Sequence, residues 1–310
     1  MTITRRGFVA GSLATTMLAS GCSARLPDAS PPQTGPGNPF KAMLRQIEGE
    51  AGGSLGAELF DVSSGLSVGI NRDRRFGHCS SFKLSLAAKI LQRDALGEDS
   101  AERRVTWSED DLMFVSPFTK ERLNEGASLR ELAEATQKYS DNAAANILLR
   151  EIGGPAALTA FWRSLGDDVS RLDRYEPALN NVPPAEFRDT STPAAMARTV
   201  AKLVYGDALP SAEQTLLRQW MVETGTGLRR VRKGLPEDWI AGNKTGTGLP
   251  QETGGTYVDI GFVEPSEGGP ITFAAYFRPA GEDNEFSRAH EEPLARVGEV
   301  LARFARDREG

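Results

Sequence analysis

The chain has 310 residues, of which 39% are hydrophobic and 25% are charged, which is typical of a globular protein with one large domain or two lobes. Its net charge of −6 excludes the basic character expected of a nucleic-acid-binding protein. Two cysteines and two histidines are too few ligands for a zinc hydrolase, so we expect no metal site.

The N-terminal 22 residues have the features of an export signal. Arg5-Arg6 precedes a short apolar stretch and resembles a twin-arginine signal peptide. Leu18-Ala-Ser-Gly-Cys22 resembles a lipoprotein cleavage box with Cys22 as the lipidated residue, and the alternative is ordinary cleavage nearby. Residues 23–39, rich in proline, serine and glycine, are predicted to form a flexible linker. We therefore expect an exported protein, periplasmic or in the cell envelope, with Cys22 as the candidate lipid anchor.

The folded region is predicted to span 40–310 and to begin with a short helix, which Gly52-Gly53 ends. Residues from about 80 to 222 are mostly helical in pattern. Within them, Ser211 and Gln214 have the spacing of a capping box at a helix start. An amphipathic helix is predicted at the C-terminus. A turn at Ser63-Ser64-Gly65 and a change from the helical period after Trp239 predict strands at 55–62, 66–70, 239–245, 256–263 and 271–277.

This order of elements predicts an α/β (α+β) fold with two lobes. Both ends of the chain, about 40–75 and 225–310, would form an α/β lobe, in which the N- and C-terminal helices flank a five-stranded antiparallel sheet. The middle, about 76–224, would form an all-helical lobe. We expect the functional site between the lobes, where ligand pockets are common.

The first candidate catalytic residues are Ser80 and Lys83. The segment from Ser80 to Gln92 is predicted to be helical, so these two side chains, three positions apart, share one face. A lysine that burial keeps neutral can take the proton of a neighbouring serine. The helix N-terminus would supply positive potential and N–H groups to an oxyanion. Because such a pair also arises by chance, it does not define a function alone.

Two further motifs accompany this pair. Ser140-Asp141-Asn142 lies between two helical segments, and Lys244-Thr245-Gly246 lies at the end of a predicted strand. With Ser-x-x-Lys, the three motifs in this order are the set by which class A β-lactamases and penicillin-binding proteins are defined. The chain resembles this family of penicillin-recognising serine enzymes over essentially all of its length after about residue 40.

A fourth element resembles the class A serine β-lactamases specifically. Arg174-Tyr-Glu176-Pro-Ala-Leu-Asn180 is similar to the loop that carries the deacylating glutamate in that class. Arg174 and Asp189 match the ion pair that closes the loop in the family. The resemblance implies that Glu176 and Asn180 hold the water that frees the acyl-enzyme.

The resemblance also implies how the β-lactam ring would open. Ser80 would attack the lactam carbonyl, with either Lys83 or Glu176 as the base for acylation, a choice that the sequence leaves open. Ser140, assisted by Lys244, would pass a proton to the lactam nitrogen. No cofactor is implied, because an activated serine carries the reaction.

The substrate-binding residues follow from the same resemblance and are predicted to be Val115, Asn142, Asn180, Arg230, Lys244, Thr245, Gly246 and Thr247. Asn142 would bind the amide of the substrate side chain. Arg230 would join Lys244 at the substrate carboxylate. The backbone N–H groups of Ser80 and Thr247 would form the oxyanion hole.

Two positions depart from the family pattern. Val115 lies at the expected pocket rim, where the family often has tyrosine or tryptophan, and this predicts a wider mouth. Some carbapenem-hydrolysing relatives join the cysteine before the nucleophile to one after Lys-Thr-Gly. Here Cys79 would face Gly248, so this disulfide cannot form. We expect Cys79 and His78 to be structural.

The sequence therefore predicts a monomeric serine β-lactamase that hydrolyses penicillins and cephalosporins and confers β-lactam resistance. A first alternative is a penicillin-binding D,D-peptidase with the same fold. A second is a non-catalytic, lipid-tethered β-lactam sensor. Glu176 and Asn180 argue against both alternatives, because neither requires rapid deacylation.

Overall fold

The computed structural model describes residues 2, 37–250, 253–281 and 285–308. The predicted signal peptide, Cys22 and nearly all of the predicted linker lie outside these residues. The first helix begins at Pro39 and is capped by Asn38, whose Oδ1 accepts hydrogen bonds from the backbone N–H of Phe40 and Lys41 at 3.0 and 3.1 Å. The fold thus starts inside the predicted linker. Within the described residues, no helix has the length and apolarity required to cross a membrane.

The helices are α1 Pro39–Ala51, α2 Phe82–Ala95, α3 Pro117–Glu121, α4 Leu129–Lys138, α5 Asn142–Glu151, α6 Pro155–Ser164, α7 Pro193–Val204, α8 Ser211–Val222 and α9 Glu292–Asp307. The strands are β1 Gly53–Asp61, β2 Ser67–Ile70, β3 Phe76–Gly77, β4 Arg104–Val105, β5 Ala127–Ser128, β6 Thr190–Ser191, β7 Ile240–Gly248, β8 Thr256–Glu264 and β9 Ile271–Pro279. Short 3₁₀ turns lie between them, and one, Cys79–Ser81, directly precedes α2.

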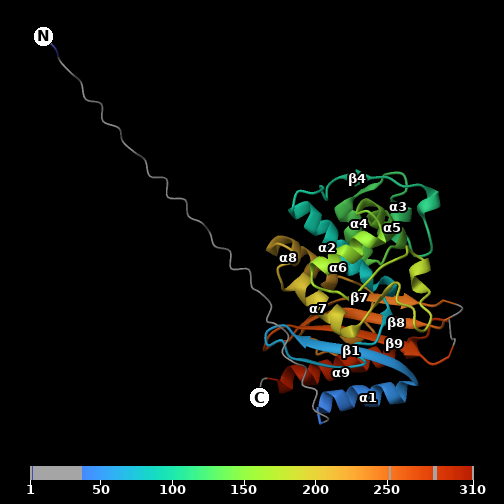
Figure 1. The fold of residues 1–310 in the computed structure, drawn as a ribbon, viewed down its shortest axis with the longest axis vertical. Coiled ribbons are helices and arrows are strands. Elements are labelled where there is room, and N and C mark those ends of the chain that lie inside the picture. The colour runs from blue at the N-terminus through green and yellow to red at the C-terminus, as the bar shows by residue number, and fades with distance from the viewer. Residues whose placement is uncertain (1, 3–36, 251–252, 282–284, 309–310) are drawn as a thin grey trace.

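Five strands form one antiparallel sheet in the order β2-β1-β9-β8-β7. The prediction of a five-stranded antiparallel sheet flanked by the terminal helices is confirmed (Figure 1). β1 pairs with β9 from Gly53↔Pro279 to Asp61↔Ile271, so the two ends of the chain meet in the middle of the sheet. Two small ribbons, β3 with β6 and β4 with β5, were not predicted.

The two faces of the sheet pack into separate cores. Along β9, Phe273, Ala275 and Phe277 belong to the core shared with α1 and α9. Ala274 and Tyr276, at the alternate positions, belong to the larger core shared with the central helices. Both faces of the sheet are therefore covered. α7, within the range predicted for the helical lobe, packs on β9, where Thr272 Oγ1 donates to the carbonyl of Ala197 at 2.8 Å.

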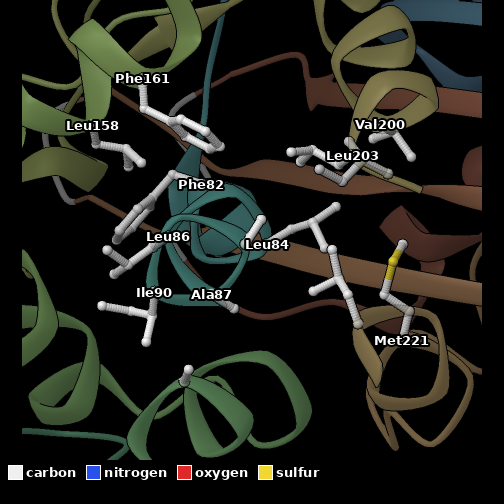
Figure 2. Close-up of a cluster of buried hydrophobic side chains, with 14 of the residues drawn as sticks. Phe82, Leu84, Leu86, Ala87, Ile90, Leu158, Phe161, Val200, Leu203 and Met221 are labelled. Carbon is white, nitrogen blue, oxygen red and sulfur yellow. The ribbon is translucent and has the colours of Figure 1, made fainter. Parts of the chain in front are cut away.

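Helix α2 passes through the centre of the larger core. Figure 2 shows Phe82, Leu86 and Ile90 on one side of this helix and Leu84 on the other, each among apolar side chains. Every residue from Phe82 to Ala88 is buried, the polar Lys83 and Ser85 included, so this part of α2 is a core helix. The surrounding side chains come from α6, α7 and α8, namely Leu158, Phe161, Val200, Leu203 and Met221. Close packing of α2 therefore holds the residues at its N-terminus in a fixed position.

Candidate active site

Ser80 lies in the 3₁₀ turn Cys79–Ser81, so the prediction that the α-helix includes Ser80 was wrong. Cys79 has a φ of +44°, which bends the chain sharply just before α2 begins. The predicted pairing of Ser80 with Lys83 is nevertheless present, because Lys83 Nζ lies 2.9 Å from Ser80 Oγ. Ser80 Oγ also lies 3.3 Å from Glu176 Oε1. Both candidate bases therefore contact the serine oxygen.

The side-chain nitrogen of Lys83 is fully buried among polar atoms. It lies 3.2 Å from Glu176 Oε1, 2.9 Å from the carbonyl oxygen of Ser140, and within hydrogen-bonding distance of Asn142 Oδ1. Burial lowers the pKa of Lys83, and the carboxylate of Glu176 opposes this shift. Lys83 thus gives up a proton more readily than a solvent-exposed lysine.

Ser140 lies between the two lysines of the site. It joins α4 to α5 with a φ of +59°, and its Oγ is 3.4 Å from Lys83 Nζ and 3.1 Å from Lys244 Nζ. Burial lowers the pKa of Lys244 well below its usual value, and the charges of Lys83 and Arg230 lower it further. The three side chains form a continuous path along which a proton can move.

Asp141 is a structural residue of the second motif. It is fully buried and caps α5 by accepting a hydrogen bond from the backbone N–H of Ala144 at 2.8 Å. Its carboxylate also accepts from the backbone N–H groups of Phe118 and Thr119, at 3.0 and 2.9 Å. Asp141 therefore fixes α3 against α5, and with them the positions of its neighbours Ser140 and Asn142.

Asn142 positions the rim segment that contains Val115. Its Nδ2 donates to the carbonyl of Phe114 at 2.9 Å, and its backbone N–H donates to the carbonyl of Val115 at 2.8 Å. Val115 has a φ of +63°, which is strained for a β-branched residue, and its side chain is exposed. The ring of Phe114 is 91% exposed, so an aromatic side chain is present one position before Val115.

Glu176 is buried and is held from two directions. Asn180 Nδ2 donates to its Oε2 at 2.6 Å, as expected for a pair that acts together. Asn146 of α5 holds its backbone, with Oδ1 accepting from Glu176 N–H at 3.0 Å and Nδ2 donating to Glu176 C=O at 2.9 Å. Sequence reasoning missed Asn146. The signal was available, because an asparagine interrupts the apolar face of α5.

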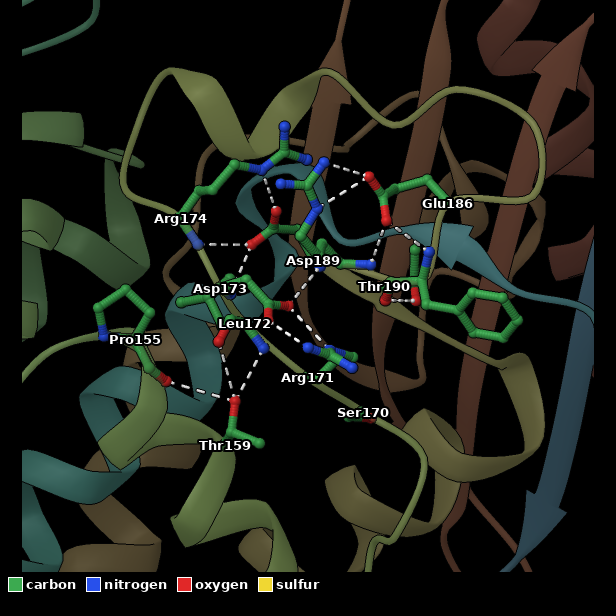
Figure 3. A network of polar contacts seen from close by, with 12 residues as sticks. Pro155, Thr159, Ser170, Arg171, Leu172, Asp173, Arg174, Glu186, Asp189 and Thr190 are labelled. Carbon is green, nitrogen blue, oxygen red and sulfur yellow. Dashed lines mark hydrogen bonds and ion pairs between the residues drawn. The ribbon is translucent and has the colours of Figure 1, made fainter.

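The loop 174–189, which carries Glu176, is closed at its base by Asp189. This buried carboxylate accepts hydrogen bonds from the backbone N–H of Asp173 and Arg174, at 2.7 and 2.9 Å, and from Arg174 Nε at 2.5 Å (Figure 3). The predicted Arg174–Asp189 ion pair is thus present. The carbonyl of Asp189 accepts from the backbone N–H of His78 at 2.9 Å, so the loop is tied to the segment that precedes Ser80.

Strand β7 lies against the turn that contains Ser80. It extends to Gly248, so Lys244, Thr245, Gly246 and Thr247 lie within the strand and not at its end as predicted. A Cβ atom on Gly246 would be 3.0 Å from Ser80 N and 2.7 Å from the carbonyl oxygen of His78. Glycine is required there because any side chain would push β7 away from the nucleophile. Thr245 Oγ1 lies 2.9 Å from the Oγ1 of Thr226.

Arg230 supports Thr247 from a buried position. Its side chain is paired with Glu291, with Nε and Oε1 3.0 Å apart. One Nη donates to the carbonyl of Gly246 at 2.8 Å, and the other donates to Thr247 Oγ1 at 2.6 Å. Arg230 was predicted to bind the substrate carboxylate, and the structure places its guanidinium on the threonine hydroxyl.

Cys79 is a buried free thiol beside β7. A Cβ on Gly248 would lie 2.9 Å from Cys79 Sγ, so these two positions face each other as predicted. Burial raises the pKa of the Cys79 thiol to about 12. The thiol is therefore neutral at physiological pH and serves as a small packing group.

We expect protonation of His78 to destabilise the fold in acid. Its ring is buried and stacks on Trp162 with the centroids 4.9 Å apart, and burial lowers its pKa from 6.5 to about 4. Between these two pKa values the unfolded chain binds a proton at His78 that the folded chain does not. The stability that neutral His78 allows is therefore fully present above pH 6.5 and is lost as the pH falls towards 4. As the pH falls through this range, the unfolding free energy of the parent protein, measured in urea, should fall by about 3 kcal/mol more than that of a His78→Phe variant. Parallel pH profiles for the two proteins would contradict the expectation.

Comparison with known proteins places the chain among β-lactamases. Residues 39–302 match the family model of the β-lactamase enzyme family. The chain is 40% identical over 253 residues to the carbapenem-hydrolysing β-lactamase KPC of Klebsiella oxytoca, a match that covers 81% of this chain and 85% of the relative. It is 37% identical over 258 residues to β-lactamase OXY-2 of the same organism, covering 83% and 87%. An ancestral (GNCA) class A β-lactamase structure has a TM-score of 0.81 at 42% identity, covering 86% of this chain and 99% of that chain.

Proposed function

The chain belongs to the class A β-lactamases, so it is a hydrolase of the β-lactam ring that confers resistance, and we propose that it acts through an acyl-Ser80 intermediate. The observation that carries this proposal is the placement of Ser80 Oγ, 2.9 Å from Lys83 Nζ and 3.3 Å from Glu176 Oε1. A hydroxyl in contact with two proton acceptors is an activated nucleophile. Penicillins and cephalosporins are the proposed substrates.

In the proposed acylation step, Ser80 Oγ attacks the lactam carbonyl carbon and its proton passes to Lys83 or Glu176. The new oxyanion accepts hydrogen bonds from the backbone N–H groups of Ser80 and Thr247. Cleavage of the C–N bond requires a proton on the departing nitrogen. Ser140 supplies it and regains a proton from Lys83 or Lys244, because its Oγ lies within 3.4 Å of both amines.

In the proposed deacylation step, Glu176 removes a proton from the water that attacks the acyl carbon. Asn180 donates to Glu176 Oε2, and within the described part of the chain Asn180 Oδ1 has no hydrogen-bond partner. This oxygen can accept the second hydrogen of the same water. The acyl C–O bond then breaks, and Ser80 Oγ takes the proton that Glu176 removed from the water, directly or through Lys83, which contacts both groups. This restores the serine hydroxyl and the Glu176 carboxylate.

The proposed substrate contacts use groups that the protein leaves available. Lys244, Thr245 and Thr247 would hold the substrate carboxylate, with Arg230 orienting the Thr247 hydroxyl. Asn142 Nδ2 gives one hydrogen to the carbonyl of Phe114 and keeps a second for the side-chain amide of the substrate. All of these groups come from one chain, so we propose that the protein acts as a monomer.

Class A β-lactamases are typically exported, and an export route is part of the proposal. Arg5-Arg6 and the apolar stretch that follows would direct export, with cleavage near Cys22. Lipidation of Cys22 would attach the enzyme to the cell envelope, with the residues between Cys22 and the cap of α1 as the tether, whereas ordinary cleavage would release it into the periplasm.

Hydrolysis of the chromogenic cephalosporin nitrocefin tests the proposed function. We expect purified protein to turn over many equivalents, and Ser80→Ala to lose both turnover and the covalent adduct because no hydroxyl remains to attack. Ser81→Ala, one position along in the same turn, is the matched control and should retain the Ser80 adduct. A single stoichiometric burst from the parent would instead identify a penicillin-binding peptidase or a sensor.

A further inference from the structure

A second pocket, separate from the residues around Ser80, lies between β3, the end of β9 and the loop segment 182–187. Its volume is about 450 Å³. Three arginines line it, namely Arg74 and Arg75 from the segment before β3 and Arg278 from β9. None of the proposed catalytic residues contributes to its wall.

Among the residues that the structure describes, the three guanidinium groups donate hydrogen bonds to neutral acceptors. Arg74 donates to Ser54 Oγ at 3.0 Å, and Arg75 donates to the carbonyl of Val169 and to Thr190 Oγ1, both at 3.0 Å. Arg278 donates to the backbone carbonyls of Val182 and Thr253, at 3.3 and 2.6 Å. Within residues 37–250, 253–281 and 285–308, none of the three forms an ion pair with a carboxylate.

Arg74 and Arg278 repel each other, and neither acid that lines the pocket is ion-paired with them among the described residues. Burial and the charge of Arg74 lower the pKa of Arg278, which stays protonated because an arginine pKa lies far above neutrality. Glu186 forms an ion pair with Arg188, with Oε2 and Nη2 2.6 Å apart. This contact is the main reason that the pKa of Glu186 is lowered to about 2. Asp73, the other acid of the pocket, is exposed, and its charge acts on Arg198, which does not line the pocket.

One part of the pocket wall is apolar and partly accessible. Val182, Pro183 and Pro184 form part of it, and the ring of Phe187 is 58% exposed. The guanidinium of Arg75 lies 5.2 Å from the centroid of that ring. The pocket therefore combines a cationic side with a flat aromatic surface.

We propose that this pocket binds a small organic anion, with its phosphate or carboxylate group held by Arg74, Arg75 and Arg278 and its compact apolar body against Phe187. Guanidinium groups bind such oxyanions through paired, charge-assisted hydrogen bonds. The bound molecule connects β9 to segment 182–187 of the loop that carries Glu176. The site is distinct from the catalytic centre and does not require the β-lactam as its ligand.

Phenyl phosphate is the probe for this proposal, titrated into ¹⁵N-labelled full-length protein at constant ionic strength. We expect saturable amide shifts in residues 73–77 and 182–187. Phenyl phosphate should bind more tightly than inorganic phosphate, and phenol should produce no shifts. Nitrocefin hydrolysis is followed in parallel, and its KM should not rise, because the probe does not occupy the active site.

Two variants and a matched control complete the experiment. Arg74→Glu and Arg278→Gln should each weaken phenyl phosphate binding by about tenfold or more. Arg303→Glu removes an exposed arginine from α9, on the other face of the sheet, and should bind as the parent does. Retained nitrocefin turnover in Arg74→Glu shows that the variant is folded. Equal weakening by Arg303→Glu, equal binding of phosphate and phenyl phosphate, or competition with nitrocefin would overturn the proposal.

Discussion

Replacing Glu176 with glutamine is expected to stop the reaction at the acyl-enzyme. Glutamine retains the shape of Glu176 and can keep a hydrogen bond to Asn180, but it cannot take a proton from water. Loss of a general base lowers turnover by about 10²–10⁴-fold. Mass spectrometry after mixing with a penicillin should find one covalent adduct on Ser80, and nitrocefin should give a burst followed by a slow phase.

The matched control for this experiment is Glu186→Gln, which changes another glutamate in the same loop. Glu186 contacts Arg188 and no proposed catalytic residue, so this variant should turn over nitrocefin as the parent does. The rate at which Glu176→Gln forms the adduct also separates the two candidate acylation bases. Adduct formation near the parental rate would assign that step to Lys83, whereas slow formation would assign it to Glu176. Turnover at the parental rate would refute the role of Glu176.

Removing the carboxylate of Asp189 is expected to cost about 3–5 kcal/mol of unfolding free energy, because it leaves Arg174 and two backbone N–H groups without their acceptor. Urea unfolding of Asp189→Ala measures this loss. The same variant should deacylate slowly, because the base of the loop that carries Glu176 would no longer be closed.

A double-mutant cycle with Arg174→Ala isolates the ion pair within this loss. Once Asp189 is absent, Arg174→Ala should lower the unfolding free energy little further, because each substitution removes the same ion pair. Glu186→Ala, which breaks an exposed pair with Arg188 in the same loop, should change stability little. Additive effects of Asp189→Ala and Arg174→Ala would show that the pair does not close the loop.

The strands of the main sheet could be predicted because each depends on a run of residues that departs from the helical period and is bounded by turn residues. All five were placed, and the main error was at the end of β7, which continues through Gly248. The small ribbons could not be predicted, since two residues do not define a period. Periodicity also does not say which neighbour a helix contacts, so the packing of α7 on the sheet was not foreseen.

Local helix-end signals were less reliable than the motifs. The capping box predicted at Ser211 is absent, because Pro210 is the residue before the first turn of α8 and the Gln214 side chain bonds to the carbonyl of Gly206. At Ser80, the sharp bend at Cys79 replaced the predicted α-helical turn. The side chains of the three motifs still converge, because their positions depend on tertiary packing more than on the exact start of a helix.

The pairing of β1 with β9 determines when this chain can complete its fold during synthesis. Residues 53–61 leave the ribosome more than two hundred residues before their partners at 271–279. Until β9, the central strand of the sheet, has been made, β1 can pair only with β2. Contacts so distant in sequence make folding slow and leave an unpaired strand edge open to association with other chains. The same pairing that brings the termini together thus makes the nascent protein dependent on protection until its last strand has been made.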